Sequence, residues 1–235
     1  MKSIKLIAII GILALWAPAA QATLVYDGSR VSTDANQITT AGSYGSAGNG
    51  FKIAWHITED TAGSPFHYEY TLSGAGGGAL AATLSHWILE VSDLATRSDF
   101  FNFNGLTPYA GQYVPATWPT GTANQGMPSD IYGIKFNSDT DYVKAGTQIY
   151  TLSFDTLRMP VWGDCFAKDV GGSSNYAYNT GFGTDPGSDT KDFNPWILVP
   201  DTKTAAVPIP GNVLPLGSGL VGLGLLRLRR RQHKS

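Results

Sequence analysis

The sequence predicts an all-β fold, a two-sheet antiparallel sandwich of jelly-roll type. Three observations indicate it: strict apolar–polar alternation in two segments, abundant Gly and other turn residues, and no sustained helical period between residues 23 and 206. This composition fits short strands joined by many turns. We also expect a helix at each end of the chain, outside this domain.

The segment 23–206 is long enough for one domain with a sizeable core. Cys165 is the only cysteine, so no disulfide can form within the chain and stability must come from core packing. We expect its thiol to be inert and at least partly buried, since no cysteine-protease context surrounds it.

Two segments carry the clearest strand pattern. In residues 51–58 every odd-numbered residue is apolar or aromatic, and in residues 66–72 every even-numbered residue is. Such alternation marks strands with one buried face. The turn-rich link between them predicts an antiparallel hairpin, with Trp55 in the core and His56 opposite His67 or Glu69.

The remaining elements are less regular. Residues 107–130 contain four prolines and cannot form a central strand. Residues 171–195, rich in Gly, Ser, Asn and Asp, are expected to be irregular as well, and residues 36–50 and 74–78 are expected to be flexible links. Further strands are predicted at 87–91, 131–136, 149–154, 159–162 and 196–199, and at most a short helix at 93–101.

Residues 1–22 have the three parts of a cleavable secretion signal. A lysine-containing start is followed by an apolar run over 6–16, and Ala20 and Ala22 are the small residues that a signal peptidase reads. The alternative is an N-terminal membrane anchor, but the apolar run is shorter than the ~20 residues that a span needs. We expect a signal helix, with the mature chain starting near Thr23.

Residues 207–235 combine a short motif, an apolar stretch and a basic cluster. As a transmembrane helix, residues 211–226 would cover roughly 24 Å, and snorkelling arginines would make up part of the ~30 Å hydrocarbon core. The alternative is a buried helix of a soluble domain, but the many glycines suit lipid better. The motif is Val207, Pro208, Ile209 and Pro210, and the cluster, expected to stay cytoplasmic, is Arg227, Arg229, Arg230 and Arg231.

This tail resembles the PEP-CTERM sorting signal of Gram-negative bacteria, which has a Val-Pro-Glu-Pro-like motif, an apolar helix and a terminal arginine cluster. Ile209 stands at the glutamate position, as in Val-Pro-Leu-Pro variants. The resemblance implies recognition by an exosortase, and it implies a bacterium that produces exopolysaccharide, biofilm or floc. Whether the same enzyme cleaves this tail is open, because the glutamate is missing.

Three segments of the middle are similar to segments of uncharacterised PEP-CTERM surface proteins. They read SHWILEVSD at 85–93, IYGIKF at 131–136 and MPVWGDCFAKDVGG at 159–172. In the motif that the third resembles, a Phe-Tyr pair stands in place of Cys165 and Phe166. No catalytic role carries over from this resemblance.

The charge of the middle differs from that of the whole chain. The net charge of −2 includes 16 basic and 18 acidic residues, and the two ends hold 7 of the basic residues and none of the acidic ones. Residues 23–206 therefore carry a charge near −9. Such a domain is not expected to bind nucleic acid.

Metal sites have two weak candidates. His56, His67 and Glu69 could meet across the hairpin, but a solvated outer sheet face explains them better, since zinc needs four ligands or three plus water. Calcium is the one cofactor for which the sequence offers candidates, since it takes six to eight oxygens from flexible loops. Its candidates are Asp139 and Asp141 in one expected turn, and Asp185, Asp189 and Asp192 in a Gly-rich loop.

Ring stacking on sugars has candidates in the proline-rich stretch, namely Tyr109, Tyr113 and Trp118. No catalytic residue is predicted. Carboxylates are present, such as Glu59 and Glu90, but no spacing pairs them across a cleft.

Three functions remain open. The first is a non-enzymatic, exported cell-surface or matrix protein, structural or adhesive, with signal peptidase and exosortase as transient partners and the membrane as a transient anchor. The second is a carbohydrate-binding module, with exopolysaccharide as its partner. The third, which we disfavour, is a secreted hydrolase.

Overall fold

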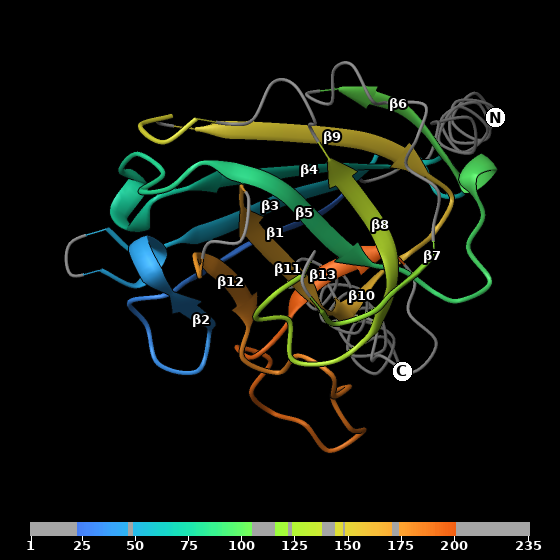
Figure 1. The fold of residues 1–235 in the computed structure, drawn as a ribbon. Coiled ribbons are helices and arrows are strands. Elements are labelled where there is room, and N and C mark those ends of the chain that lie inside the picture. The colour runs from blue at the N-terminus through green and yellow to red at the C-terminus, as the bar shows by residue number, and fades with distance from the viewer. Residues whose placement is uncertain are drawn as a thin grey trace, which may run out of the picture.

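The computed structural model describes residues 23–46, 49–104, 116–121, 124–137, 144–147, 149–170 and 174–200. The fold is an all-β sandwich of two antiparallel sheets packed face to face (Figure 1). The five-stranded sheet has the order β1 (Leu24–Val31), β3 (Lys52–Glu59), β4 (Phe66–Ser73), β9 (Tyr150–Thr156) and β6 (Phe100–Asn104).

The second sheet has six strands. Its order is β2 (Ile38–Ala41), β12 (Tyr176–Asn179), β11 (Cys165–Asp169), β5 (Leu84–Glu90), β8 (Ile131–Asn137) and β7 (Ala116–Trp118). A separate antiparallel pair joins β10 (Pro160–Gly163) to β13 (Ile197–Pro200). The helices of the described residues are the 3-10 turns η2 (Gly42–Gly45), η3 (Ala75–Gly77) and η4 (Arg97–Asp99).

Aromatic rings join the two sheets across the core. Tyr70 of β4 meets Trp87 of β5 edge-on at 5.0 Å between ring centroids. Phe154 of β9 stacks on Phe136 of β8 at 6.0 Å. Burial of such large rings dominates core energetics and fixes how the sheets face each other.

The predicted hairpin is confirmed. β3 pairs with β4, and all the apolar residues of the predicted alternation are buried. His56 lies opposite Glu69, while His67 lies opposite Thr58. Trp55 is buried as expected. The other five predicted strands are present as β5, β8, β9, β10 and β13, with ends shifted by a few residues.

Two expectations need correction. The predicted link 36–50 contains β2 and η2, and the stretch 171–195, expected to be irregular, contains β12. The segment 93–101, where at most a short helix is expected, does contain one short helix, the 3-10 turn η4, before β6 begins at Phe100. In these segments sheet pairing with distant strands prevails over a local sequence full of turn residues.

β1 is a strand that the alternation pattern did not predict. Its inward positions include Arg30, which is buried because its guanidinium lies over the rings of Trp55 and Trp162, at 5.1 and 5.4 Å. Arg30 also donates a 2.8 Å hydrogen bond to the carbonyl of Phe193. A charged residue on a buried face hides a strand from a search for apolar periodicity.

No helix among the described residues is long and apolar enough to cross a membrane. The predicted signal and the predicted membrane segment lie outside those residues. The described chain ends at Pro200, whose Cα partner is Pro160 at the start of β10.

Candidate functional site

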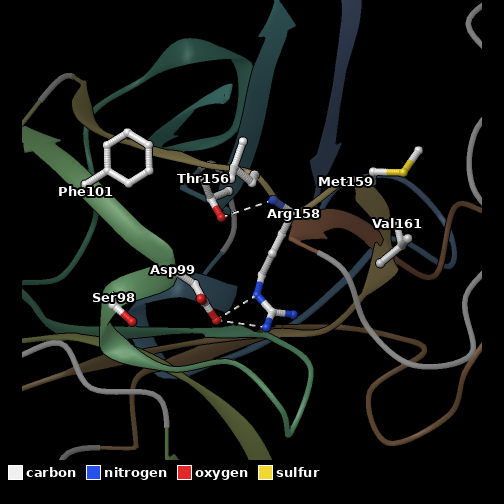
Figure 2. A pocket seen from close by; sticks show the side chains of 8 residues that line it. Ser98, Asp99, Phe101, Thr156, Arg158, Met159 and Val161 are labelled. Atoms are coloured by element: carbon white, nitrogen blue, oxygen red, sulfur yellow. Dashed lines mark hydrogen bonds and ion pairs between the residues drawn. The ribbon is translucent and has the colours of Figure 1, made fainter. Parts of the chain in front are cut away.

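A pocket of about 510 Å³ opens where β9 ends and the chain turns into β10 (Figure 2). Its other wall comes from η4 and β6, which precede β9 by about fifty residues in the chain. We call it the Arg158 pocket. It is lined by Ser98, Asp99, Phe101, Thr156, Leu157, Arg158, Met159 and Val161.

An ion pair crosses the pocket. Arg158 reaches toward Asp99, and its Nη2 and Nε donate to Oδ2 of Asp99 at 2.9 and 3.3 Å (Figure 2). Partial burial acts to raise the pKa of Asp99, but hydrogen bonds from Thr96 and Arg158 outweigh it and the pKa lies below its usual value. The carboxylate therefore stays ionised at neutral pH.

Local sequence fixes the position of Asp99. It is the third residue of η4, where its side chain accepts the backbone N–H of Thr96 at 2.8 Å in a capping box. The backbone of Arg158 is fixed as well: its N–H donates to Oγ1 of Thr156, and its carbonyl accepts the hydroxyl of buried Tyr68. Both charged residues are thus held before any ligand arrives.

The rim of the Arg158 pocket is apolar and open to solvent. Phe101, Leu157 and Met159 are 37%, 69% and 48% exposed. The other exposed large apolar residues of the described chain are Leu94 and Ile149, so most of this class gathers at one pocket. Exposed apolar side chains that cluster around polar groups are typical of a binding surface.

A second, more polar recess lies beside the β3–β4 turn. It has a volume of about 450 Å³ and is lined by Thr58, Asp60, Ser64, Pro65, His67 and Asp155. His67 Nδ1 lies 2.6 Å from Oδ1 of Asp155. Asp155 also accepts a 2.6 Å hydrogen bond from Asn102.

The histidines do not gather as a metal site would require. His56 pairs with Asp27 of β1 at 2.5 Å, whereas His67 pairs with Asp155 of β9. The described residues hold no group of three or more His, Cys, Asp or Glu side chains placed to bind one ion. Both histidines lie exposed on the outer face of the five-stranded sheet, as expected for a solvated sheet face.

The sequence did not predict a pair of neighbouring acidic residues, of which Asp164 is buried and Glu90 is half-buried. Glu90 Oε2 accepts the backbone N–H of Asp164 at 2.7 Å, and Asp164 is 5% exposed. Burial, together with the neighbouring charge of Asp164, raises the pKa of Glu90 to about 8. Burial also raises the pKa of Asp164 to about 7, although hydrogen bonds from Asn179 and Gly183 oppose the rise.

These two carboxyls have a structural role. Asp164 accepts Nδ2 of Asn179 at 2.7 Å and the backbone N–H of Gly183 at 2.6 Å, which ties the loop 180–195 to β11. Asn179 in turn accepts the N–H of Cys165 and donates to the carbonyl of Pro195. Cys165 is fully buried, and burial raises the pKa of its thiol, as expected for an inert cysteine.

Most predicted site residues lie outside the described residues. This holds for Ala20 and Ala22, for Val207 to Pro210, for Arg227 and the other tail arginines, and for Tyr109, Tyr113, Asp139 and Asp141. Trp118 closes β7, the edge strand of the second sheet, and pairs with Ile131. Asp185 and Asp189 lie exposed in the loop 180–195.

The Arg158 pocket was missed because its residues carry no local signature. The capping pattern of Thr96 and Asp99 was readable, but nothing in the sequence placed it beside Arg158. Comparisons of the chain with protein-family models, with curated proteins and with solved structures found no significant match.

Proposed function

We propose that this chain is an exported, non-enzymatic protein of the cell surface or extracellular matrix, sorted by a PEP-CTERM-type system. The observation that carries the proposal is the order of signals around one sandwich domain. A secretion signal precedes it, and the motif at Val207–Pro210, an apolar stretch and an arginine cluster follow it. Signal peptidase and an exosortase are the partners during export.

The sandwich suits this role. Its core is built from stacked aromatic rings, and the buried carboxyl of Asp164 ties a long loop to the sheet, so the domain needs no disulfide after export. We propose the finer jelly-roll description for the two sheets, a cleaved signal helix at 1–22 and a transient membrane helix within 211–226. The ectodomain would serve as a structural or adhesive element in an exopolysaccharide matrix.

The test is the mass and location of the protein in its host. We expect a surface or matrix form that starts near Thr23 and has lost the residues beyond the 207–210 motif. As a control, a variant in which Arg227, Arg229, Arg230 and Arg231 are all alanine should lose sorting. A surface protein with an intact C-terminus would contradict processing, and hydrolysis of any polysaccharide or ester by the purified protein would contradict the non-enzymatic role.

Carbohydrate binding is the second candidate. Trp118 lies at the end of edge strand β7, and Tyr109 and Tyr113 precede it closely in the sequence. Aromatic rings of this kind can stack on the sugar rings of a polysaccharide. A glycan array tests this proposal. Binding that is lost in Trp118→Ala, with the fold intact, would support it, and binding unchanged by that substitution would exclude stacking on this ring.

A further inference from the structure

The Arg158 pocket lies where the described chain ends. In the antiparallel β10–β13 pair, Val161 faces Val199 and Pro160 faces Pro200. If this register continues past Pro200, the outgoing chain runs alongside Met159 and then Leu157, which line the pocket. The direction of the chain thus leads to the apolar rim of the pocket.

The β10–β13 ladder cannot continue regularly along that path. The N–H of Arg158 is bonded to Oγ1 of Thr156, and its carbonyl is bonded to the hydroxyl of Tyr68. A chain that passes here must therefore bind through its side chains. The exposed side chains of Phe101, Leu157 and Met159 offer it an apolar surface.

The sequence beyond Pro200 supplies a matching apolar segment. Residues 201–206 are polar or small, and Val207 and Ile209 are the first large apolar side chains after Pro200. Seven extended residues span at most about 23 Å, which is ample for Val207 to reach a pocket that begins beside Pro160. The position and chemistry of this segment agree with those of the pocket.

The motif is also preorganised for docking. A residue that precedes proline is restricted to extended conformations, and both Val207 and Ile209 precede a proline. A segment that is already extended loses less conformational entropy when it binds in a groove.

We propose that the Arg158 pocket binds the Val207–Pro210 segment of its own chain. The contact goes beyond sorting, because it does not depend on whether an exosortase cleaves the tail. While docked, the motif is covered by the sandwich and is withheld from a processing enzyme. Release of the segment would then control when the motif can be read.

Disulfide capture in the purified full chain, held in detergent, tests the contact. The variant Met159→Cys with Ile209→Cys should form an intramolecular disulfide under mild oxidation. The matched control is Leu94→Cys with Ile209→Cys, because Leu94 is exposed, more so than Met159, but lies outside the pocket. Docking raises the effective concentration of the paired thiols, so we expect about tenfold faster closure than in the control.

Trypsin cleavage after Lys203 gives a second readout without new cysteines. Leu157→Asp should disrupt docking and speed this cleavage several-fold, whereas Leu94→Asp should leave its rate unchanged. Both side chains are largely exposed, so neither change should prevent folding.

Three results would overturn the proposal. Equal rates of disulfide formation in the pocket variant and the control variant would show that the tail does not dock. A disulfide dimer in place of the intramolecular bond would assign the pocket to a second copy of the chain. Protection of a Leu157→Cys thiol only when lipid vesicles are present would assign it to the membrane. None of these results bears on whether the tail is processed in the host, so failure here and failure of the sorting proposal can be told apart.

Discussion

Glu90 Oε2 accepts a 2.7 Å hydrogen bond from the backbone N–H of Asp164, so a residue of β5 is tied to the residue that precedes β11. The Asp164 carboxyl is itself buried and holds the loop 180–195 through Gly183. The charge of Asp164 raises the cost of ionising Glu90, and the charge of Asp185 raises that cost for both carboxyls. The pair makes the stability of the domain depend on pH.

Stability should fall as pH rises from 6.5 to 8.5. In the unfolded chain Glu90 ionises near pH 4, so in this range only the folded protein releases its proton, near pH 8. The folded state binds more protons than the unfolded state, so the free energy of unfolding decreases by about 2 kcal/mol across this pH range. This decrease corresponds to a melting temperature lower by roughly 4–8 °C. Thermal melts at several pH values should show that the melting temperature falls less steeply with pH in Glu90→Gln than in wild type.

The control for this prediction is Glu69→Gln, since Glu69 lies on β4 in the other sheet. It should keep the wild-type slope. The range above pH 6.5 is chosen because burial and the charge of Lys135 lower the pKa of His86 to about 3. Below pH 6.5 the unfolded chain therefore takes up a proton at His86 that the folded protein does not, and this contribution opposes that of the two carboxyls. An unchanged slope in Glu90→Gln would show that the pair does not titrate as described.

Asn179→Ala should destabilise the domain by about 2–4 kcal/mol, because it leaves buried polar groups without partners. The fully buried Asn179 side chain bonds the N–H of Cys165, the carboxyl of Asp164 and the carbonyl of Pro195. Urea unfolding measures the loss. Exposed Asn194→Ala, at the end of the same loop, should change stability by less than about 0.5 kcal/mol. Equal effects of the two substitutions would contradict the network.

Gly28→Ala should cost about 1–3 kcal/mol through overpacking. Gly28 lies opposite Trp55 in the β1–β3 pair, and a methyl group there would overlap the indole. The indole cannot move freely, because Arg30 lies over it. Gly187→Ala is the matched control, since its nearest atom would be Oγ1 of Thr190 at 3.9 Å. A stable Gly28→Ala variant would show that the ring can shift.

Cys165 should resist thiol reagents in the folded protein and react only when the domain unfolds. Its side chain is fully buried, and burial raises its pKa, which keeps it as the unreactive thiol. Maleimide labelling followed by mass spectrometry, with and without denaturant, measures this. Fast labelling of the native protein would reveal an opening of β11. In that case the disulfide-capture variants would also need Cys165→Ala, because a reactive Cys165 would compete with the introduced cysteines.

The sequence by itself determined the all-β class, the β3–β4 hairpin and the burial of Trp55. These features follow from local alternation, which a single strand expresses without knowledge of its neighbours. The same local reasoning predicts the export and sorting signals, because such addresses are read by other proteins as short linear segments. It also indicated that Cys165 would be inert.

Only the tertiary structure decided which residues meet. β1 was missed because its inward residue Arg30 is accommodated by two tryptophans, one of them over a hundred residues away. Glu90 and Asp164 carried no useful spacing, and Asp99 meets Arg158 only because β6 pairs with β9. In an antiparallel sandwich most contacts join distant segments, so the pairing of strands, which no local pattern encodes, assembles the pocket and brings Glu90 to Asp164.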